Sequence, residues 1–331
     1  MIFPADCAHI ILGFSAAMSV RNAFSIPRQD TISAEFTLHE GAPGQSTLLS
    51  DWFAERTRWQ NANFSNAPEI GSRAPAHEFE ILTNVERLKT AETIVLWLDR
   101  FLDTQIVACF VASLVETGQL AATQVYQIQY GSIAGHNVSI PTLRERELLS
   151  YKTTLEHVSL ELSQRRGEFW QRYVAAQNAE QLAHLIKHPN ISTVADLAIH
   201  SLMKRFPSAS NGLTQWDTEL LISALNHQPN TARIMAHMLG DFVFNQPDQR
   251  NDLILHHRMM QMSDHLKGPP VFEFVGDPAA IRSHTTHCLP LAEEILSGKK
   301  NYLQVRNDYP EIANVRMSKD NIFFREEFDK L

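Results

Sequence analysis

The feature that most constrains the fold is an alternation of apolar runs and helical segments in the first 141 residues. The apolar runs are typical of strands, and they are HIILGF (9–14), TISAEFTL (31–38), ETIVLWL (92–98) and QVYQIQY (124–130). Between them lie the segments predicted as helices, SAAMSVRNAF (15–24), SDWFAERTRWQNANF (50–64) and TQIVACFVASLVETGQ (104–119). Strand and helix in turn predict a Rossmann-like α/β domain, with helices on the faces of a parallel sheet.

From residue 142 onward the pattern becomes helical. Residues 143–177 carry apolar positions at three- and four-residue spacing, which predicts helix throughout. Further helices are expected at 192–206, 214–225, 230–239 and 289–299, with one strand inside 268–277. We therefore divide the chain into an α/β domain (1–141), a helical connecting region (142–210) and an all-α, winged-helix-like C-terminal domain (211–331).

Composition narrows the class of protein. The chain has 331 residues, of which 44% are hydrophobic, so it can bury a sizeable core. The net charge is −8 and no segment is strongly basic, which disfavours nucleic acid as a partner. The three cysteines are widely spaced, no basic segment precedes Arg21, and the run TQIVACFVASLV is too short to span a membrane. We expect a cytoplasmic protein that does not contact a membrane.

The turn after the first predicted strand is a candidate ligand site. Gly13 is followed by Ser15, and G-x-S-x-A resembles the nucleophile elbow of hydrolases. No acid and histidine at suitable spacing accompany this serine, so capping of the next helix by Ser15 is favoured. A helix N-terminus also binds anions. The predicted ligand-binding residues are Gly13, Ser15, Ser19, Arg21 and Gln105.

Polar residues at the ends of two later strands are candidates for acid–base chemistry. Asp99 and Asp103 follow the apolar run 92–98, where ligands gather in α/β sheets. His39 and Glu40 follow the predicted strand 31–38. The alternative is that these residues form solvated turns, with Asp103 capping the helix that follows.

Histidines near the C-terminus are weak candidates for a metal site. His284, His287 and Cys288 lie in SHTTHC, and His256 and His257 lie upstream in LHHR. They lack the close pairing of structural zinc ligands, so a polar turn is favoured and no metal site is predicted here. The sequence leaves open whether the protein has a cofactor.

Several stretches suggest a family. They occur in the order HIILGFSAAMSV, TLHEGAP, IVLWLDRFLDTQI, KRFPSASNGLTQWDTELL, FEFVGDPA and LPLAEEILSGKKNY, followed by Asn307. Over most of its length the chain resembles the bacterial DUF1835 family, a domain of unknown function, with a DUF3658-like C-terminal part. The resemblance implies a fold and no assigned activity. The family pattern has aspartate at or near Phe14, Phe36 and Phe101, so the resemblance implies that a cluster of carboxylates is missing here.

Two functions are consistent with these features. The first is a binding protein whose α/β crevice holds a small anionic ligand or a protein partner, at a family site that has lost its acids. The second is an enzyme acting on a nucleotide or phosphate ester through Asp99, Asp103, His39 and Glu40, with or without a divalent metal. An enzyme requires Asp99 or Asp103 to point into an open pocket beside a second titratable group. The oligomeric state is left open.

Overall fold

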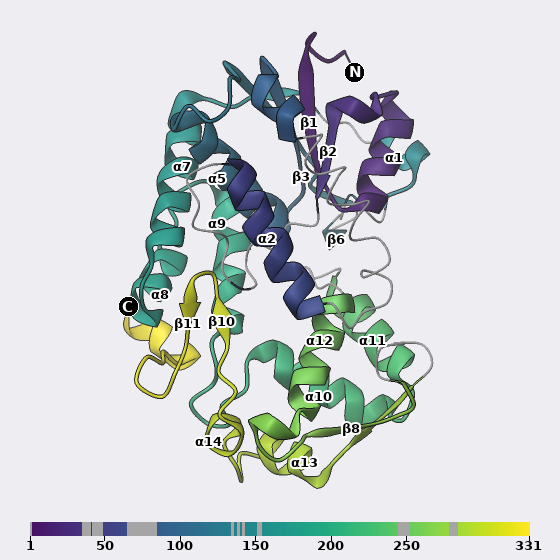
Figure 1. Cartoon of the computed structure of the whole chain (residues 1–331), viewed down its shortest axis with the longest axis vertical. Helices are drawn as coiled ribbons and strands as arrows, with labels where there is room; N and C mark the ends of the chain where they lie inside the picture. Colours follow the sequence, from purple (N-terminus) through teal and green to yellow (C-terminus); the bar gives the residue numbers. More distant parts are fainter. Residues whose placement is uncertain are drawn as a thin grey trace.

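The structure, a computed structural model, describes residues 2–34, 41, 49–64, 85–133, 136–137, 140, 143–150, 154–243, 252–277 and 284–331. Its N-terminal part is built on a five-stranded sheet of order β2-β1-β3-β4-β7 (Figure 1). The strands are β1 (Cys7–Leu12), β2 (Thr31–Ala34), β3 (Thr93–Leu98), β4 (Gln124–Gln129) and β7 (Glu156–His157). The first four are parallel and β7 is antiparallel to β4, which confirms a mostly parallel α/β sheet.

Helices cover both faces of this sheet. They are α1 (Phe14–Phe24), α2 (Leu49–Phe64), α5 (Leu102–Glu116) and α6 (Glu145–Ser150). One face packs apolar side chains of β1 and β3 against α1 and α6, and the other packs against α2 and α5. All six residues of β3 are buried, as expected for a strand covered on both sides. The short elements η1 (Arg28–Asp30), β5 (Ser132–Ile133) and β6 (His136–Asn137) flank this unit.

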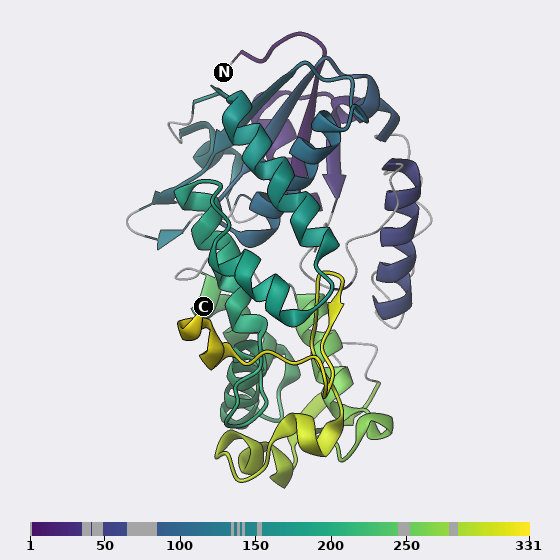
Figure 2. The same cartoon turned by 90° about the vertical axis from the view of Figure 1, so that its left-hand side faces the viewer.

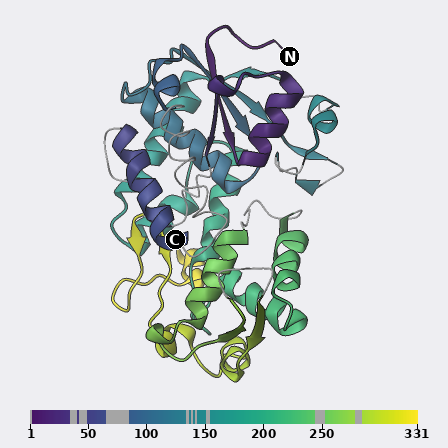
Figure 3. The same ribbon diagram turned by 45° about the vertical axis from the view of Figure 1, so that its right-hand side comes forward.

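The strand order reverses its direction between β1 and β3. The chain leaves β1 for β2 on one side and later returns to β3 on the other, so the direction of winding reverses between β1 and β3. Ligands of open α/β sheets bind at such a reversal, beyond the carboxyl ends of the strands. β1 and β2 run toward the C-terminal helices, so this edge of the sheet faces the rest of the molecule (Figure 3).

The connecting region differs from the prediction of continuous helix over 143–177. It contains α6, the edge strand β7 and then α7 (Leu160–Ala175). Ser159 ends the interruption because its side chain accepts the backbone N–H of Leu162 and caps α7. The region continues with α8 (Ala179–Lys187), α9 (Thr193–His200) and the 3₁₀ segment η3 (Ser201–Arg205).

The connecting helices and the end of the chain share a core with the sheet. Apolar residues of α7, α8 and α9 belong to the same cluster as α5. The hairpin of β10 (Glu311–Ile312) and β11 (Val315–Arg316) and the last segment, η5 (Arg325–Lys330), return to that cluster through Ile312, Met317 and Phe328. The C-terminus therefore lies beside α8 (Figures 1 and 2).

The C-terminal part forms a second core. Its elements are α10 (Gln215–His227), α11 (Thr231–Val243), α12 (Asp252–Ser263), η4 (His265–Lys267), β8 (Phe272–Val275), β9 (Thr285–Cys288), α13 (Pro290–Leu296) and α14 (Tyr302–Arg306). Leu220, Met238, Met259 and Phe272 lie at its centre. The helical character of this part is confirmed, and the two strands pair as an antiparallel hairpin. Among the described residues, no helix combines the length and the apolar composition needed to cross a membrane.

Candidate functional site

The turn after β1 differs from its predicted form at Ser15. Gly13 is the N-cap residue of α1, with a φ of 87°, and no side chain caps this helix. Because the positive φ of Gly13 turns the chain directly from strand into helix, α1 begins at Phe14. Ser15 is therefore inside the first turn, where it is exposed, and the prediction that it caps the helix is wrong. Ser19 and Arg21 follow on the same helix, both half-buried.

Asp99 anchors the turn after β3. Its carboxylate is 1% exposed, and one oxygen accepts hydrogen bonds from the backbone N–H of Phe101 (3.0 Å) and the Thr104 hydroxyl (2.8 Å). The other oxygen accepts the backbone N–H of Ile140 at 3.3 Å. Burial raises the pKa of Asp99 to about 6, although these hydrogen bonds oppose the rise. This carboxylate is committed to holding the start of α5 and residue 140 in place.

The residues around Asp99 belong to the same turn. Phe101, not Asp103, is the N-cap residue of α5, so the prediction that Asp103 caps this helix is wrong. Asp103 lies in the first turn, and the Asp99 carboxylate accepts the backbone N–H of the N-cap residue Phe101. Gln105 is buried, and its amide donates to the carbonyl of Asp99 (2.6 Å) and to Gln129 (3.2 Å). The structure therefore brings Asp99, Asp103 and Gln105 together in a hydrogen-bonded turn.

Other predicted residues fall outside the described part of the chain. His39, Glu40 and Phe36 lie there, and nothing is described of the Phe14 side chain. Phe101 is fully buried. In a binding protein without the family's acids, Phe14, Phe36 and Phe101 are expected to pack together at the floor of the crevice, and this stays a prediction.

The histidine-rich segment does not gather a set of metal ligands. His287 and Cys288 are neighbours on β9, so their side chains point to opposite faces of the hairpin. His284 is buried with its ring 5.4 Å from that of His256. Among the residues that the structure describes, no group of three or more His, Cys, Asp or Glu side chains is arranged to hold a metal ion.

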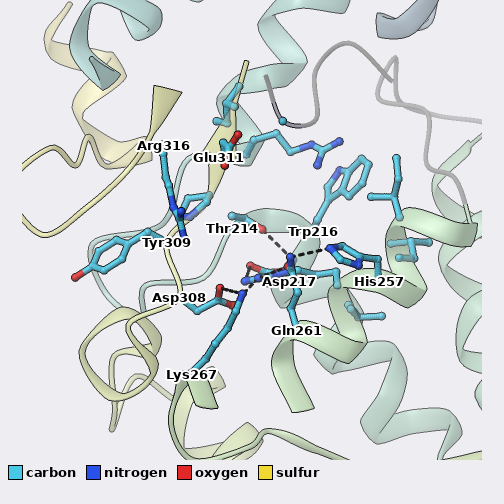
Figure 4. A pocket seen from close by; sticks show the side chains of 18 of the residues that line it. Thr214, Trp216, Asp217, His257, Gln261, Lys267, Asp308, Tyr309, Glu311 and Arg316 are labelled. Atoms are coloured by element: carbon cyan, nitrogen blue, oxygen red, sulfur yellow. Dashed lines mark hydrogen bonds and ion pairs between the residues drawn. The ribbon is translucent and has the colours of Figure 1, made fainter. Parts of the chain in front are cut away.

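A pocket lies elsewhere, between the C-terminal helices and the chain segments packed above them (Figure 4). Its volume is about 310 Å³. It is lined from α2, η3, α10, α12, η4 and the β10–β11 hairpin by residues that include Gly41, Trp59, Arg205, Thr214, Trp216, Asp217, His257, Arg258, Gln261, Lys267, Asp308, Glu311 and Arg316.

Two carboxylates on one wall are neutralised within the protein. The Arg258 guanidinium pairs with both oxygens of Asp217 (2.7 and 3.0 Å) and with Asp308 (2.6 Å). Asp308 also accepts from Lys267 (2.8 Å) and from the Tyr302 hydroxyl (2.5 Å). Burial opposes ionisation of Asp308, but Arg258, with Lys267 and Tyr302, outweighs it and holds the pKa of this carboxyl well below its usual range. This wall is a closed network with little charge to offer a ligand.

Local structure fixes the members of the network. Asp217 lies in the first turn of α10, where its N–H donates to the N-cap Thr214 hydroxyl at 3.1 Å. Asp308 follows the C-terminus of α14, where Asn307 adopts a left-handed conformation. Arg306, at the end of α14, is fully buried and donates to four backbone carbonyls between residues 261 and 269. The end of α12 and the residues around Asp308 are therefore held together.

Two tryptophans, Trp216 and Trp59, are also part of the pocket lining. The Arg205 guanidinium stacks over the Trp216 ring, 3.1 Å from its centre, and Arg56 lies 4.1 Å over Trp59. Gly41 packs against Trp59 so closely that a Cβ there would lie 2.1 Å from the indole, and its φ is +62°. Only glycine fits both conditions. Gly41, the glycine of the HEG stretch in the sequence, is thus part of the pocket lining.

Arg316 differs from the other pocket cations. It lies on β11 opposite Glu311, with an exposed side chain that extends into the pocket (Figure 4). Within the described residues, its guanidinium makes no hydrogen bond or ion pair. It is a cation of this pocket whose hydrogen-bond donors are uncommitted.

The sequence marked parts of this pocket without locating it. The loop containing Gly41, the LHHR segment with His257 and the TQWD segment with Asp217 were singled out. The role of Arg258 and the residues Lys267 and Asp308 were not predicted, because the ion pairs that they form join residues 41 and 50 positions apart. Arg316 was not predicted either, because it reaches the pocket only through the packing of the β10–β11 hairpin. Residue spacing gives no signal for such contacts.

Comparison with known proteins gave no relative. Neither a scan against models of protein families nor a search of curated proteins found a match to this chain.

Proposed function

We propose that this protein binds a small anionic ligand in the pocket between the C-terminal helices and the β10–β11 hairpin. The observation that carries the proposal is the uncommitted guanidinium of Arg316 in a pocket whose Asp217 and Asp308 are already paired. An arginine fork matches the geometry of a carboxylate or a phosphate oxygen pair. The anionic group of the ligand is held by Arg316.

The size and lining of the pocket support a small ligand. A volume of about 310 Å³ is at the lower end of the range for small-molecule pockets, which is about 300 to 1,000 Å³. Trp216 and Trp59 contribute aromatic side chains to the lining. A compact organic anion suits this combination better than a polymer.

The family resemblance is consistent with this location. Three of the stretches on which it rests, TLHEGAP, KRFPSASNGLTQWDTELL and the region of Asn307, supply or adjoin Gly41, Arg205, Trp216, Asp217 and Asp308 of the pocket lining. We also propose membership of the DUF1835 family, a winged-helix-like C-terminal unit that packs against the other parts, and a cytoplasmic location.

The alternative enzyme and the predicted crevice site find less support. Both oxygens of Asp99 accept hydrogen bonds within the protein, and neither Asp99 nor Asp103 lines the pocket that contains Arg316. The pocket lining includes Gly41 but no residue of β1, β3 or the turn that contains Asp99. A protein partner remains the competing occupant.

The test is thermal unfolding in the presence of a panel of small carboxylates, sulfonates, sugar phosphates and nucleotides. A ligand at a hundred times its Kd stabilises the folded state by about 2.7 kcal/mol. We expect at least one anion to raise the Tm of the wild type and to leave Arg316→Ala unchanged. Arg172→Ala, which removes an exposed arginine from α7, is the matched control and should respond as the wild type does. If no compound of the panel raises the Tm of the wild type, the result would contradict binding of a small anion and favour a protein partner.

A further inference from the structure

His257 lines the pocket beside Gln261, and the hydrogen bonds of this glutamine decide where the imidazole carries its proton. The side-chain oxygen of Gln261 accepts from the Arg258 guanidinium at 3.0 Å. The side-chain nitrogen of Gln261 lies 2.8 Å from Nε2 of His257. A guanidinium can only donate hydrogen bonds, so the amide cannot turn its NH₂ group toward Arg258.

The orientation of the amide fixes the tautomer of the ring. The NH₂ group of Gln261 faces His257 and can only donate, so Nε2 must accept through its lone pair. The proton of the neutral ring is then on Nδ1. Protonation at Nε2 would set an N–H against the N–H of Gln261 and remove this hydrogen bond.

The rest of the wall prevents the amide from rotating. Asp217 pairs with Arg258 at two points, and Asp308 holds a third donor of the same guanidinium. With Nε and Nη2 paired to Asp217, the guanidinium presents an N–H of Nη1 to the Gln261 oxygen. Hydrogen-bond partners of this kind set the tautomer and ring orientation of histidines in functional sites.

The charge of the pocket depends on this ring. Around His257, four cations and three carboxylates line the pocket among the described residues, and they are Arg205, Arg258, Lys267, Arg316, Asp217, Asp308 and Glu311. With His257 neutral, the lining has one positive charge in excess. The cost of desolvating an ion rises with the square of its charge, whereas its attraction to the excess charge rises only in proportion.

We propose that the pocket selects a singly charged anion, because the series Asp217–Arg258–Gln261–His257 holds His257 as a neutral imidazole. The ligand class is thus a carboxylate, sulfonate or phosphodiester in preference to a doubly charged phosphate monoester. The place of the ligand rests on the proposed function, whereas the tautomer rests on the contacts of Gln261 alone.

The tautomer is tested by ¹⁵N NMR of protein labelled at histidine, with the His257 signals assigned from a His257→Gln variant. At pH 7 we expect a protonated Nδ1 and a bare Nε2. Gln261→Glu should move a proton to Nε2, because a carboxylate can only accept. Gln171→Glu, at an exposed position of α7, should leave the His257 signals unchanged. A wild-type ring protonated at Nε2 would overturn the proposal.

The ligand class is tested by calorimetry with methanesulfonate and sulfate, which share a tetrahedral sulfur–oxygen head and differ in charge. At equal ionic strength we expect methanesulfonate to bind the wild type about tenfold more tightly than sulfate. His257→Lys, which adds a permanent cation, should reduce that preference. Sulfate binding as tightly as methanesulfonate, with a neutral His257, would overturn the selection of a monoanion. If neither probe and no anion of the thermal panel binds, the proposed function fails, whatever tautomer the NMR spectrum reports.

Discussion

Asp217 and Arg258 form a two-point ion pair, with distances of 2.7 and 3.0 Å, that joins α10 to α12 across one wall of the pocket. Because Arg258 also holds Asp308 and Gln261, this pair organises a wall assembled from segments far apart in the sequence. The charged groups of this wall are paired with one another. The guanidinium of Arg316, on the β10–β11 hairpin, makes no hydrogen bond or ion pair within the described residues.

Removing Asp217 should destabilise the fold. The carboxylate is buried, so Asp217→Ala leaves Arg258 with only part of its compensation. Loss of one partner from a buried pair costs about 3 kcal/mol, which urea denaturation measures. The exposed Asp320→Ala is the matched control and should cost less than about 0.5 kcal/mol. Equal effects of the two substitutions would show that the ion pair does not organise this wall.

Asp99 should make the fold less stable as the pH rises. Its pKa of about 6 lies above the unfolded value, so between pH 4 and 6 the folded state holds the proton and the unfolded state releases it. The stabilisation is complete below about pH 4 and is lost as the pH rises through 6, a change of about 3 kcal/mol. Denaturation curves of Asp99→Asn across this range should lack that loss. An unchanged pH profile in the variant would refute the assignment.

His9 should act in the opposite direction. It is buried beneath Trp97, whose indole N–H donates to Nδ1 at 3.1 Å, and burial lowers the pKa of His9 to about 4. Since the unfolded histidine takes up its proton near pH 6.5, stability falls as the pH drops from about 6.5 to about 4, by about 3 kcal/mol. His9→Asn should lose this acid sensitivity. In the wild type the pH-dependent contributions of His9 and Asp99 to the free energy of unfolding have opposite signs and largely cancel. His9→Asn should therefore show the pH dependence caused by Asp99, and Asp99→Asn should show the one caused by His9.

Gly41 should be required for the shape of the pocket, independently of its backbone conformation. Gly41 and Gly118 both have positive φ, so alanine at either costs about 1 kcal/mol in strain. A Cβ at Gly118 meets nothing within 4 Å, whereas one at Gly41 meets the Trp59 indole. Anion affinity, measured by calorimetry, should therefore fall in Gly41→Ala and stay unchanged in Gly118→Ala. If Gly41→Ala and Gly118→Ala bind the anion with equal affinity, Trp59 does not contribute to the binding surface.

The fold was predictable where the pattern is local. The buried strand Thr93–Leu98 and the helices α5, α10 and α11 follow from apolar runs and periodicity in their own segments. The edge strand Glu156–His157 was not, because two exposed polar residues carry no strand signal and pair only through the neighbouring β4. The start of α1 was misplaced because a glycine with positive φ replaced the expected serine cap.

The candidate site was less predictable than the fold. Asp99 and Gln105 were predicted as site residues because they follow the carboxyl end of a strand, where ligands of α/β sheets bind. In the structure both residues form hydrogen bonds that stabilise the turn after β3. Arg316 is an exposed residue of a two-residue strand, and only the tertiary arrangement brings it to α10 and α12. The spacing of residues along the sequence cannot predict the role of a side chain that lines a site together with residues far away in the chain.

The most direct test of the central claim is calorimetric titration of the strongest anion from the thermal panel into the wild type, Arg316→Ala and Ser15→Ala. Ser15 lies at the N-terminus of α1 in the predicted crevice, whereas Arg316 lies in the pocket. The account predicts that Arg316→Ala raises the Kd at least about tenfold, corresponding to one lost charge-assisted interaction, and that Ser15→Ala does not change it. Loss of affinity in Ser15→Ala with full affinity in Arg316→Ala would contradict the account and return the site to the α/β crevice.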